Sequence, residues 1–154
     1  MSKVGTRLIN FFANYQYIVY NSIMNSYIAY CDGGSRGNPG SSASASIVYD
    51  QDNKTIKEVS KYMGITTNNV AEWQSLILAL TTAQELKLYP ITIRMDSLLV
   101  VSQIQDKWKV KTPHLLPYYK QAKLLTNKNV KFEHVRREFN KEADRLVNEL
   151  LDSI

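Results

Sequence analysis

The order and spacing of strand-like segments constrain the fold of this chain more than any other feature. Three runs of strand formers, at residues 27–32, 42–49 and 54–63, are joined by segments of turn-forming residues that leave no room for a helix. Connections of this kind usually join antiparallel neighbours. Two later runs, at residues 91–95 and 130–135, are each reached through helical segments, which favours parallel pairing. The order β-β-β-α-β-α-α-β-α predicts an α/β (mixed α+β) fold, with a five-stranded mixed sheet flanked by helices.

The expected helices have recognisable boundaries. Thr and Asn residues at 67–69 are good caps for the first helix, which Pro90 ends. Shorter helices are expected at 97–105 and 115–125, and Asn140 is expected to cap the last one. The apolar stripe of the first helix consists of Val70, Trp73, Ile77, Leu80, Ala83 and Leu86.

Four acidic residues occupy positions from which carboxylates could converge. Asp32 and Asp96 end strand-like runs, whereas Glu72 and Asp144 lie in the first turns of expected helices. Taken singly, each has a plainer interpretation as a turn residue, a cap or an acid favoured by the helix dipole. Taken together, four oxygen donors at one edge of a sheet would suit Mg²⁺ or Mn²⁺. The arrangement therefore favours metal-dependent phosphodiester chemistry.

The distribution of charge favours a polyanionic partner. The formal net charge is +5, and residues 107–145 hold eleven Lys and Arg against four Asp and Glu, a balance of +7. A basic stretch of this kind suits nucleic acid, although a solvated basic face would give the same count. The one cysteine, Cys31, excludes an intramolecular disulfide and a Cys-based zinc site. A lone cysteine fits a reducing compartment, and we expect a cytoplasmic location.

Residues 1–25 differ from the rest because they contain no acidic residue. Asn and Gln interrupt their apolar pattern, which makes them a poor membrane span. We expect a helical, non-catalytic N-terminal extension at 1–25, followed by a catalytic domain at 26–154. An accessory helix, an organelle-targeting segment and a start at Met24 all remain open. The apolar positions near helical spacing are Leu8, Phe11, Phe12, Tyr15, Ile18, Val19 and Ile23.

Four motifs resemble those of the type 1 ribonuclease H family, in the same order and at similar spacing, between about Tyr27 and Leu150. They are DGGSRGNPG with Asp32, TTNNVAE with Glu72, MDS with Asp96 and REFNKEAD with Asp144. The resemblance implies a ribonuclease H-like fold and hydrolysis of the RNA strand of RNA–DNA hybrids, leaving 3′-hydroxyl and 5′-phosphate ends.

The resemblance also implies two bound Mg²⁺ or Mn²⁺ ions. Asp32 would bridge both ions, Asp144 would hold the ion that activates water, and Glu72 with Asp96 would hold the other. Substrate contacts would come from Gly33, Ser35, Gly37, Asn38, Thr67, Asn68 and Asn69, with further contacts from Trp108, Lys111 and Arg137. Several of these positions have plainer interpretations as turn residues, helix caps, or a packed Trp beside solvated lysines.

The chain departs from the family pattern in three places. It lacks the long basic protrusion between the middle helices, and Leu98 stands where many members carry Gln. The His-bearing loop before the last carboxylate is short, so His134 falls in the fifth strand and receives no proton-transfer role. Arg137 or Glu138 could partly fill that gap. The chain resembles the shorter branch of the family, without the protrusion and the His-bearing loop.

Two alternatives to a hybrid-specific ribonuclease remain open. One keeps the fold but cuts double-stranded RNA as well, or serves as the hydrolase of a retroelement. The other is a non-catalytic hybrid-binding module, although four clustered acids facing a polyanion would not serve simple binding. We expect a monomer without a membrane partner. Cellular role and metal preference are not indicated by the sequence.

Overall fold

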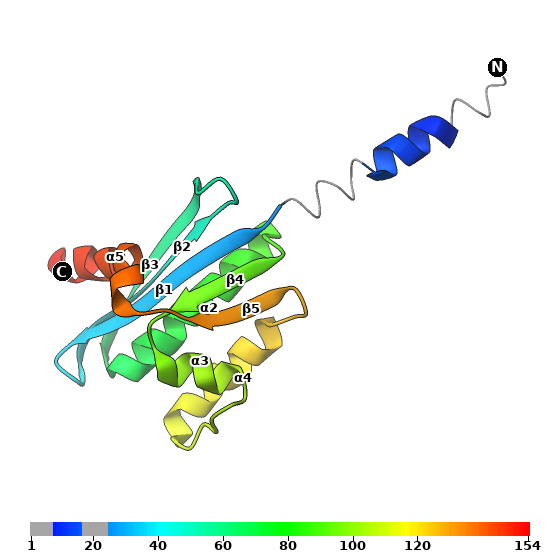
Figure 1. The fold of residues 1–154 in the computed structure, drawn as a ribbon. Coiled ribbons are helices and arrows are strands. Elements are labelled where there is room, and N and C mark those ends of the chain that lie inside the picture. The colour runs from blue at the N-terminus through cyan, green and yellow to red at the C-terminus, as the bar shows by residue number, and fades with distance from the viewer. Residues whose placement is uncertain (1–7, 17–24) are drawn as a thin grey trace.

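The computed structural model describes residues 8–16 and 25–154 (Figure 1). Within the second range, a five-stranded sheet has the order β3-β2-β1-β4-β5. The strands are β1 (Tyr27–Arg36), β2 (Gly40–Tyr49), β3 (Thr55–Thr66), β4 (Ile91–Met95) and β5 (Val130–His134). The helices are α2 (Asn68–Leu86), α3 (Leu98–Ile104), α4 (Leu116–Leu125) and α5 (Lys141–Asp152), with short 3₁₀ turns at Pro113–Leu115 and Arg137–Phe139. The predicted element order is confirmed, and the two 3₁₀ turns were not expected.

Strand pairing makes the sheet mixed, as predicted. β1 pairs antiparallel with β2, and β2 pairs antiparallel with β3. β4 pairs in parallel with β1 and with β5, and both of these connections pass through helices. Figure 1 shows α5 on the opposite side of the sheet from α2.

Alternation along the strands builds a core on each face of the sheet. Ala29 and Cys31 of β1 belong to the larger core, which α2, α3 and α4 complete. Ala45 and Ile47 of β2 belong to the smaller core, where they pack against Leu146 and other apolar residues of α5. Successive side chains in a strand point to opposite faces of the sheet. β2 therefore contributes Val48 to the larger core and Ala45 and Ile47 to the smaller one.

The first strand is longer than the sequence predicted. We expected it to end at Asp32, but pairing with β2 continues until Arg36 lies opposite Ser41. The turn then needs only residues 37–39, and Gly37 adopts a φ of +89° that favours glycine. Parallel pairing with β4 stops earlier, where Tyr30 lies opposite Arg94. Asp32 therefore lies within β1, just beyond the point where β4 stops pairing with it.

The first strong helix also departs from its predicted pattern at one end. Leu86 was placed on the apolar stripe, but its side chain is 48% exposed. It lies in the last turn, next to Lys87, whose left-handed backbone ends the helix. Elsewhere α2 is buried on more than one side, because it lies between the sheet and α4 and contacts both. Its buried residues thus exceed the single stripe that the sequence predicted.

A close backbone contact fixes α2 against β1. A Cβ atom added at Gly33 would lie 2.1 Å from the Ala71 carbonyl carbon and 2.4 Å from the Glu72 nitrogen. The Ser44 hydroxyl donates to the Ala71 carbonyl oxygen at 2.6 Å, which joins β2 to the same point of the helix. Glycine at 33 therefore lets the backbone of α2 approach the sheet beside Asp32 and Glu72.

The N-terminal extension is described only in part. Residues 8–16 form a helix on which Leu8, Ile9, Phe11, Phe12 and Tyr15 are all more than half exposed. Ile18, Val19, Ile23 and Met24 lie outside the described residues, so the division at residue 25 stays a prediction. None of the helices in the described ranges is both long and apolar enough to cross a membrane.

We expect Gly33→Ala to destabilise the protein by about 1–3 kcal/mol or more, because its methyl group would overlap the backbone of α2. Gly34→Ala is the matched control, since a Cβ atom there would meet only the Val147 Cγ1 atom at 3.3 Å. Urea unfolding followed by circular dichroism measures both changes. Equal losses of stability in the two variants would contradict the close contact.

Candidate active site

The four acidic residues singled out in the sequence line one pocket of about 280 Å³. Asp32 comes from β1, Glu72 from α2, Asp96 from the residue after β4 and Asp144 from α5. The pocket lies where β1 extends past β4. Both strands reach it, as do α2 on one face of the sheet and α5 on the other. Its other lining residues are Gly33, Gly34, Ser35, Arg36, Asn68, Arg137, Val147, Asn148 and Leu151.

Asp32 carries the most perturbed of these carboxyl groups. Burial and the negative charges of Asp96, Asp144 and Glu72 raise its pKa to about 8, although a hydrogen bond from the Gly33 backbone opposes the shift. A carboxyl group with this pKa keeps its proton near neutral pH unless a cation compensates its charge. Because Asp96, Asp144 and Glu72 all contribute to this pKa shift, the four carboxylates form one electrostatically interacting group.

Glu72 is held by two neutral donors. Asn68 donates from Nδ2 to Oε1 at 3.2 Å, and the Ser97 hydroxyl donates to Oε2 at 2.8 Å. Burial raises the pKa of Glu72, the Ser97 hydrogen bond opposes that shift, and the charge of Asp96 adds to it. Glu72 lies in the second turn of α2 and not in the first, because the helix begins at Asn68 after the Thr67 cap.

Asp96 receives a hydrogen bond from a distant residue. Asn140 donates from Nδ2 to Asp96 Oδ1 at 2.9 Å and to the Cys31 carbonyl oxygen at 2.9 Å. The following residue, Ser97, caps α3 by accepting from the Val100 backbone at 3.3 Å. The cap that the sequence suggested for Asp96 thus belongs to its neighbour. Asn140 occupies the predicted N-cap position of α5, but its side chain makes no capping hydrogen bond and turns toward β1 and Asp96 instead.

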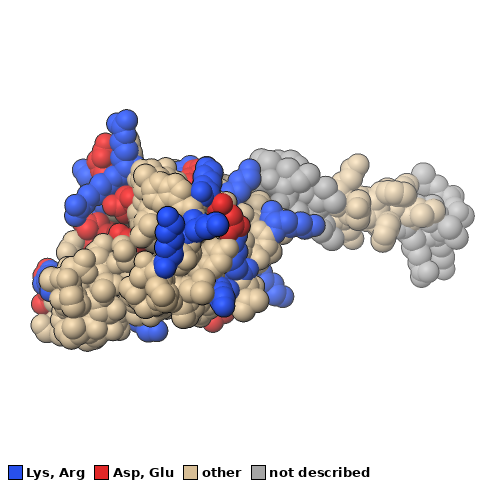
Figure 2. Space-filling view, turned by 90° about the horizontal axis from the view of Figure 1, so that it is seen from below, with Lys and Arg blue, Asp and Glu red and all other residues tan. Residues whose placement is uncertain are grey.

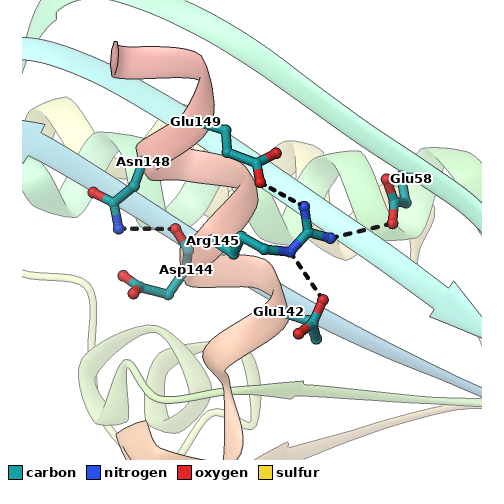
Figure 3. Close-up of polar contacts among 6 residues, drawn as sticks. All are labelled: Glu58, Glu142, Asp144, Arg145, Asn148 and Glu149. Carbon is teal, nitrogen blue, oxygen red and sulfur yellow. Dashed lines mark hydrogen bonds and ion pairs between the residues drawn. The ribbon is translucent and has the colours of Figure 1, made fainter.

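Asp144 projects from the side of α5 away from an ion-pair cluster. Figure 3 shows its carboxylate on the opposite side of the helix from the Arg145 guanidinium. Arg145 pairs with Glu142 at 3.0 Å, Glu149 at 2.8 Å and Glu58 of β3 at 3.5 Å. Exposed pairs of this kind add little stability, but the bond to Glu58 links α5 to the edge strand.

The donor set of the pocket fits a hard divalent cation. Four carboxylates with mutual repulsion and hydrogen bonds only from neutral groups favour oxygen-seeking ions such as Mg²⁺ and Mn²⁺. In the part of the chain that the structure describes, no three His, Cys, Asp or Glu side chains yet converge at metal-binding distance. After burial, the negative charges of Asp96, Asp144 and Glu72 raise the Asp32 pKa, and the same repulsion opposes closer approach of these groups without a cation.

The pocket gathers some of the predicted substrate-binding residues. Gly33, Ser35, Asn68 and Arg137 line it. Six others do not line the pocket: four lie near its rim, where hydrogen bonds hold the chain, and two lie in the loop after α3. Ser35 donates to the carbonyl oxygens of Gly37 and Thr66, Asn38 Oδ1 accepts from the Asn68 backbone at 3.0 Å, and Thr67 Oγ1 accepts from Val70 at 3.3 Å. The predicted residues outside the pocket near this rim are Gly37, Asn38, Thr67 and Asn69, and Lys111 lies in the loop after α3.

Trp108 lies apart from the carboxylates in the loop between α3 and α4. It is 48% exposed and lines a separate pocket of about 300 Å³ with Lys109 and Tyr119. The loop is held in place, because Asp106 accepts from Tyr119 at 2.6 Å and from Lys123 at 2.5 Å. The structure therefore leaves the substrate roles of Trp108 and Lys111 as predictions, on an exposed loop.

Four polar residues of the pocket or its support were not predicted as site residues. Ser97 and Asn140 hold carboxylates, whereas Arg36 and Asn148 line the pocket wall. Arg36 forms an ion pair with Asp152 at the end of α5. The only sequence signal for Asn140 is its place four residues before Asp144, which also fits an ordinary helix start.

A mixed sheet of this order, with four carboxylates gathered where β1 extends past β4, defines a ribonuclease H-like domain, and solved structures agree. The N-terminal RNase H domain of Rv2228c from Mycobacterium tuberculosis superposes with a TM-score of 0.80 at 39% identity, covering 84% of this chain and 95% of that one. LC11-RNase H1 in complex with an RNA/DNA hybrid gives 0.75 at 42% identity, covering 80% and 95%.

Comparison by sequence gives the family. The family model described as reverse transcriptase-like matches residues 30–150. Ribonuclease H of Clostridium botulinum is 30% identical over 152 residues, covering 84% of this chain and 97% of that protein. The bifunctional protein Rv2228c of Mycobacterium tuberculosis is 43% identical over 125 residues, and the match covers 79% of this chain but 34% of that longer protein. The chain belongs to the type 1 ribonuclease H family.

We expect Asp32→Asn to stabilise the metal-free protein, increasingly so as pH rises from about 4 to about 8. The folded Asp32 has a pKa of about 8 against an ordinary value of 3.8, so it keeps a proton that the unfolded chain releases. Folding stability from this group is therefore lost as pH rises through that window. Thermal unfolding in EDTA across the pH range measures the difference from wild type. Asp52→Asn, in the exposed β2–β3 turn, is the control, and a difference that shrinks with pH would contradict this account.

Ser97→Ala and Thr67→Ala should each lower the free energy of unfolding by about 1 kcal/mol, because each removes a helix cap. Only Ser97→Ala also removes a hydrogen bond to Glu72, because the Ser97 hydroxyl donates to Glu72 Oε2 at 2.8 Å. We therefore expect Ser97→Ala alone to reduce the rise in melting temperature that Mn²⁺ produces. An equal Mn²⁺ response in both variants would show that the Ser97 hydroxyl does not support the metal site.

Proposed function

We propose that this domain is an endoribonuclease that hydrolyses the RNA strand of RNA–DNA hybrids with divalent cations. The observation that carries the proposal is the single pocket lined by Asp32, Glu72, Asp96 and Asp144. Membership of the type 1 ribonuclease H family supports the same reaction, as does the likeness to LC11-RNase H1 with its bound RNA/DNA hybrid. The match to longer mycobacterial proteins covers one part of them, so the proposal concerns this domain alone.

In this mechanism the chain supplies ligands and orientation. Asp32 would hold two Mg²⁺ or Mn²⁺ ions jointly, Asp144 would complete one binding position, and Glu72 with Asp96 would complete the other. The ions, when bound, would activate a water molecule and stabilise the departing 3′ oxygen. His134 ends β5 with its Nε2 near the Asp96 carbonyl oxygen at 3.3 Å, and we assign it no proton transfer.

Substrate would be read along the rim of the pocket. Gly33 and Ser35 line the pocket and would face the RNA strand, where a 2′-hydroxyl distinguishes RNA from DNA. Asn38, Thr67, Asn68 and Asn69 cluster where the β1–β2 turn meets the start of α2, since the Asn68 backbone donates to Asn38. We propose that this cluster contacts the hybrid across its groove.

Two basic regions would bind the phosphate backbone. Arg137 lines the carboxylate pocket and offers a cation for a phosphate next to the reacting one. Trp108 and Lys111, on the loop after α3, would contact the strand farther along. Figure 2 shows many Lys and Arg side chains over one face of the described domain. Contacts of this kind should make binding sensitive to salt. We further propose that the domain acts as a monomer in the cytoplasm.

The test is cleavage of end-labelled RNA–DNA hybrid, double-stranded RNA and double-stranded DNA in Mg²⁺ or Mn²⁺. We expect cleavage of the hybrid alone, with 3′-hydroxyl and 5′-phosphate ends. Asp96→Asn should lower the rate at least about 100-fold, because it removes a metal ligand. Asp52→Asn, on the exposed β2–β3 turn, should cut at the wild-type rate.

Other outcomes would decide between the alternatives. Cutting of double-stranded RNA would favour a broader nuclease, and tight binding without cleavage by the wild type would favour a non-catalytic module. Full activity of Asp96→Asn would overturn the assignment of the site.

A further inference from the structure

Asn140 joins the parts of the chain that carry the carboxylates. Its Nδ2 atom donates to the Cys31 carbonyl oxygen, directly before Asp32, and to Asp96 Oδ1, both at 2.9 Å. Its own carbonyl oxygen accepts from the Asp144 backbone nitrogen at 3.2 Å. One residue therefore contacts Asp96 and the backbone on which Asp32 and Asp144 are carried.

The position is too enclosed for an incidental contact. Asn140 is 1% exposed, and its Oδ1 atom has no hydrogen-bond partner among the described residues. Burying an amide is costly unless its polar atoms are paired, and here only the nitrogen is. A capping hydrogen bond to α5 would have been the easier use of this side chain, but the structure gives it none. The two donated bonds are thus what the buried amide provides.

An amide also matches the electrostatics of the site. A primary amide has two N–H groups, which suffice for one carbonyl and one carboxylate. Being neutral, it orients Asp96 without adding negative charge to the four carboxylates. It also leaves their negative charge to be balanced by a cation. A Lys or Arg here would occupy the role of the cation, and an apolar residue would leave Asp96 Oδ1 and the Cys31 carbonyl oxygen without this donor.

We propose that Asn140 is a positioning residue, which fixes Asp96 and the start of α5 relative to the part of β1 that carries Asp32, so that the carboxylates can share divalent cations. This inference rests on the proposed function for its catalytic meaning. Its physical content is metal affinity, which can be measured without turnover. Side chains that orient metal ligands typically change metal affinity about 10- to 100-fold when removed.

A double-mutant cycle tests the inference. Mn²⁺ binding is measured by titration calorimetry for wild type, Asn140→Ala, Asp96→Asn and the double variant. We expect Asn140→Ala to weaken Mn²⁺ binding by about 10-fold or more. In the Asp96→Asn background, the same substitution should have a much smaller effect, because its main target is gone. Val130→Ala, in β5 at the other end of the sheet, is the control for a general loss of stability.

Two results would overturn the inference. One is Mn²⁺ affinity in Asn140→Ala within about 2-fold of wild type, and the other is an equal effect of Asn140→Ala in both backgrounds, as expected for a purely structural residue. If the alanine variant does not fold, Asn140→Ser, which keeps a hydroxyl donor, replaces it in the same cycle. Wild type that binds Mn²⁺ but leaves RNA–DNA hybrid intact would refute the proposed function alone.

The kinetic counterpart separates positioning from substrate binding. With saturating Mn²⁺, Asn140→Ala should lower kcat on the hybrid about 10-fold or more while KM stays within about 2-fold, because no contact of Asn140 faces the pocket rim where substrate would lie. Val130→Ala should leave both values unchanged below its melting temperature. A change in KM alone would contradict a positioning role.

Discussion

The backbone contact between Gly33 and Ala71 determines how near α2 lies to the sheet, and the rest of the site depends on it. Asp32 precedes one member of this contact, and Glu72 follows the other. Because neither residue can move away from its neighbour in sequence, the approach of the two backbones sets the approach of the two carboxylates. A side chain at 33 would separate the elements, and no adjustment of rotamers at Asp32 or Glu72 would restore the same geometry.

The approach of these carboxylates carries an electrostatic cost that the surrounding hydrogen bonds do not remove. Ser97, Asn68 and Asn140 all donate to carboxylates and are all neutral. They fix the direction of the oxygen atoms while the pKa of Asp32 stays raised to about 8. Among the described residues, the ion pair of Arg36 is with Asp152 and not with one of the four acids. Neutral donors leave the negative charge of the site unbalanced, so the site still favours binding of a cation, as a metal-dependent enzyme requires.

Local patterns in the sequence predicted the parts of this structure that local forces decide. Strand-forming runs and turn residues predict the order of elements, and four local motifs predict the convergence of Asp32, Glu72, Asp96 and Asp144, which line one pocket. The errors arose where a distant partner decides the outcome. Asn140 looks like a cap for α5, but partners 109 and 44 residues away, at Cys31 and Asp96, take its side chain.

The length of β1 was misjudged for the same reason. A Gly-rich segment is typical of a turn, yet pairing with β2 keeps it extended to Arg36. The loop after α3, which carries Trp108 and Lys111, also depends on a distant partner. Trp108 and Lys111 could be located after α3, but whether they touch a nucleic acid depends on a partner that leaves no periodic signal in the chain.

The pocket also draws on both faces of the sheet, which explains why Asp144 needs separate support. Glu72 comes from α2, in the larger core, whereas Asp144 comes from α5, which packs through Leu146 and Val147 on the smaller one. Two cores that adjust independently would let the carboxylates drift apart, since each helix could shift on its own face. The bonds of Asn140 cross from the start of α5 to β1 and to the end of β4 at the edge where both faces meet. A buried polar link at that junction restricts the relative motion that apolar packing, being non-directional, leaves possible.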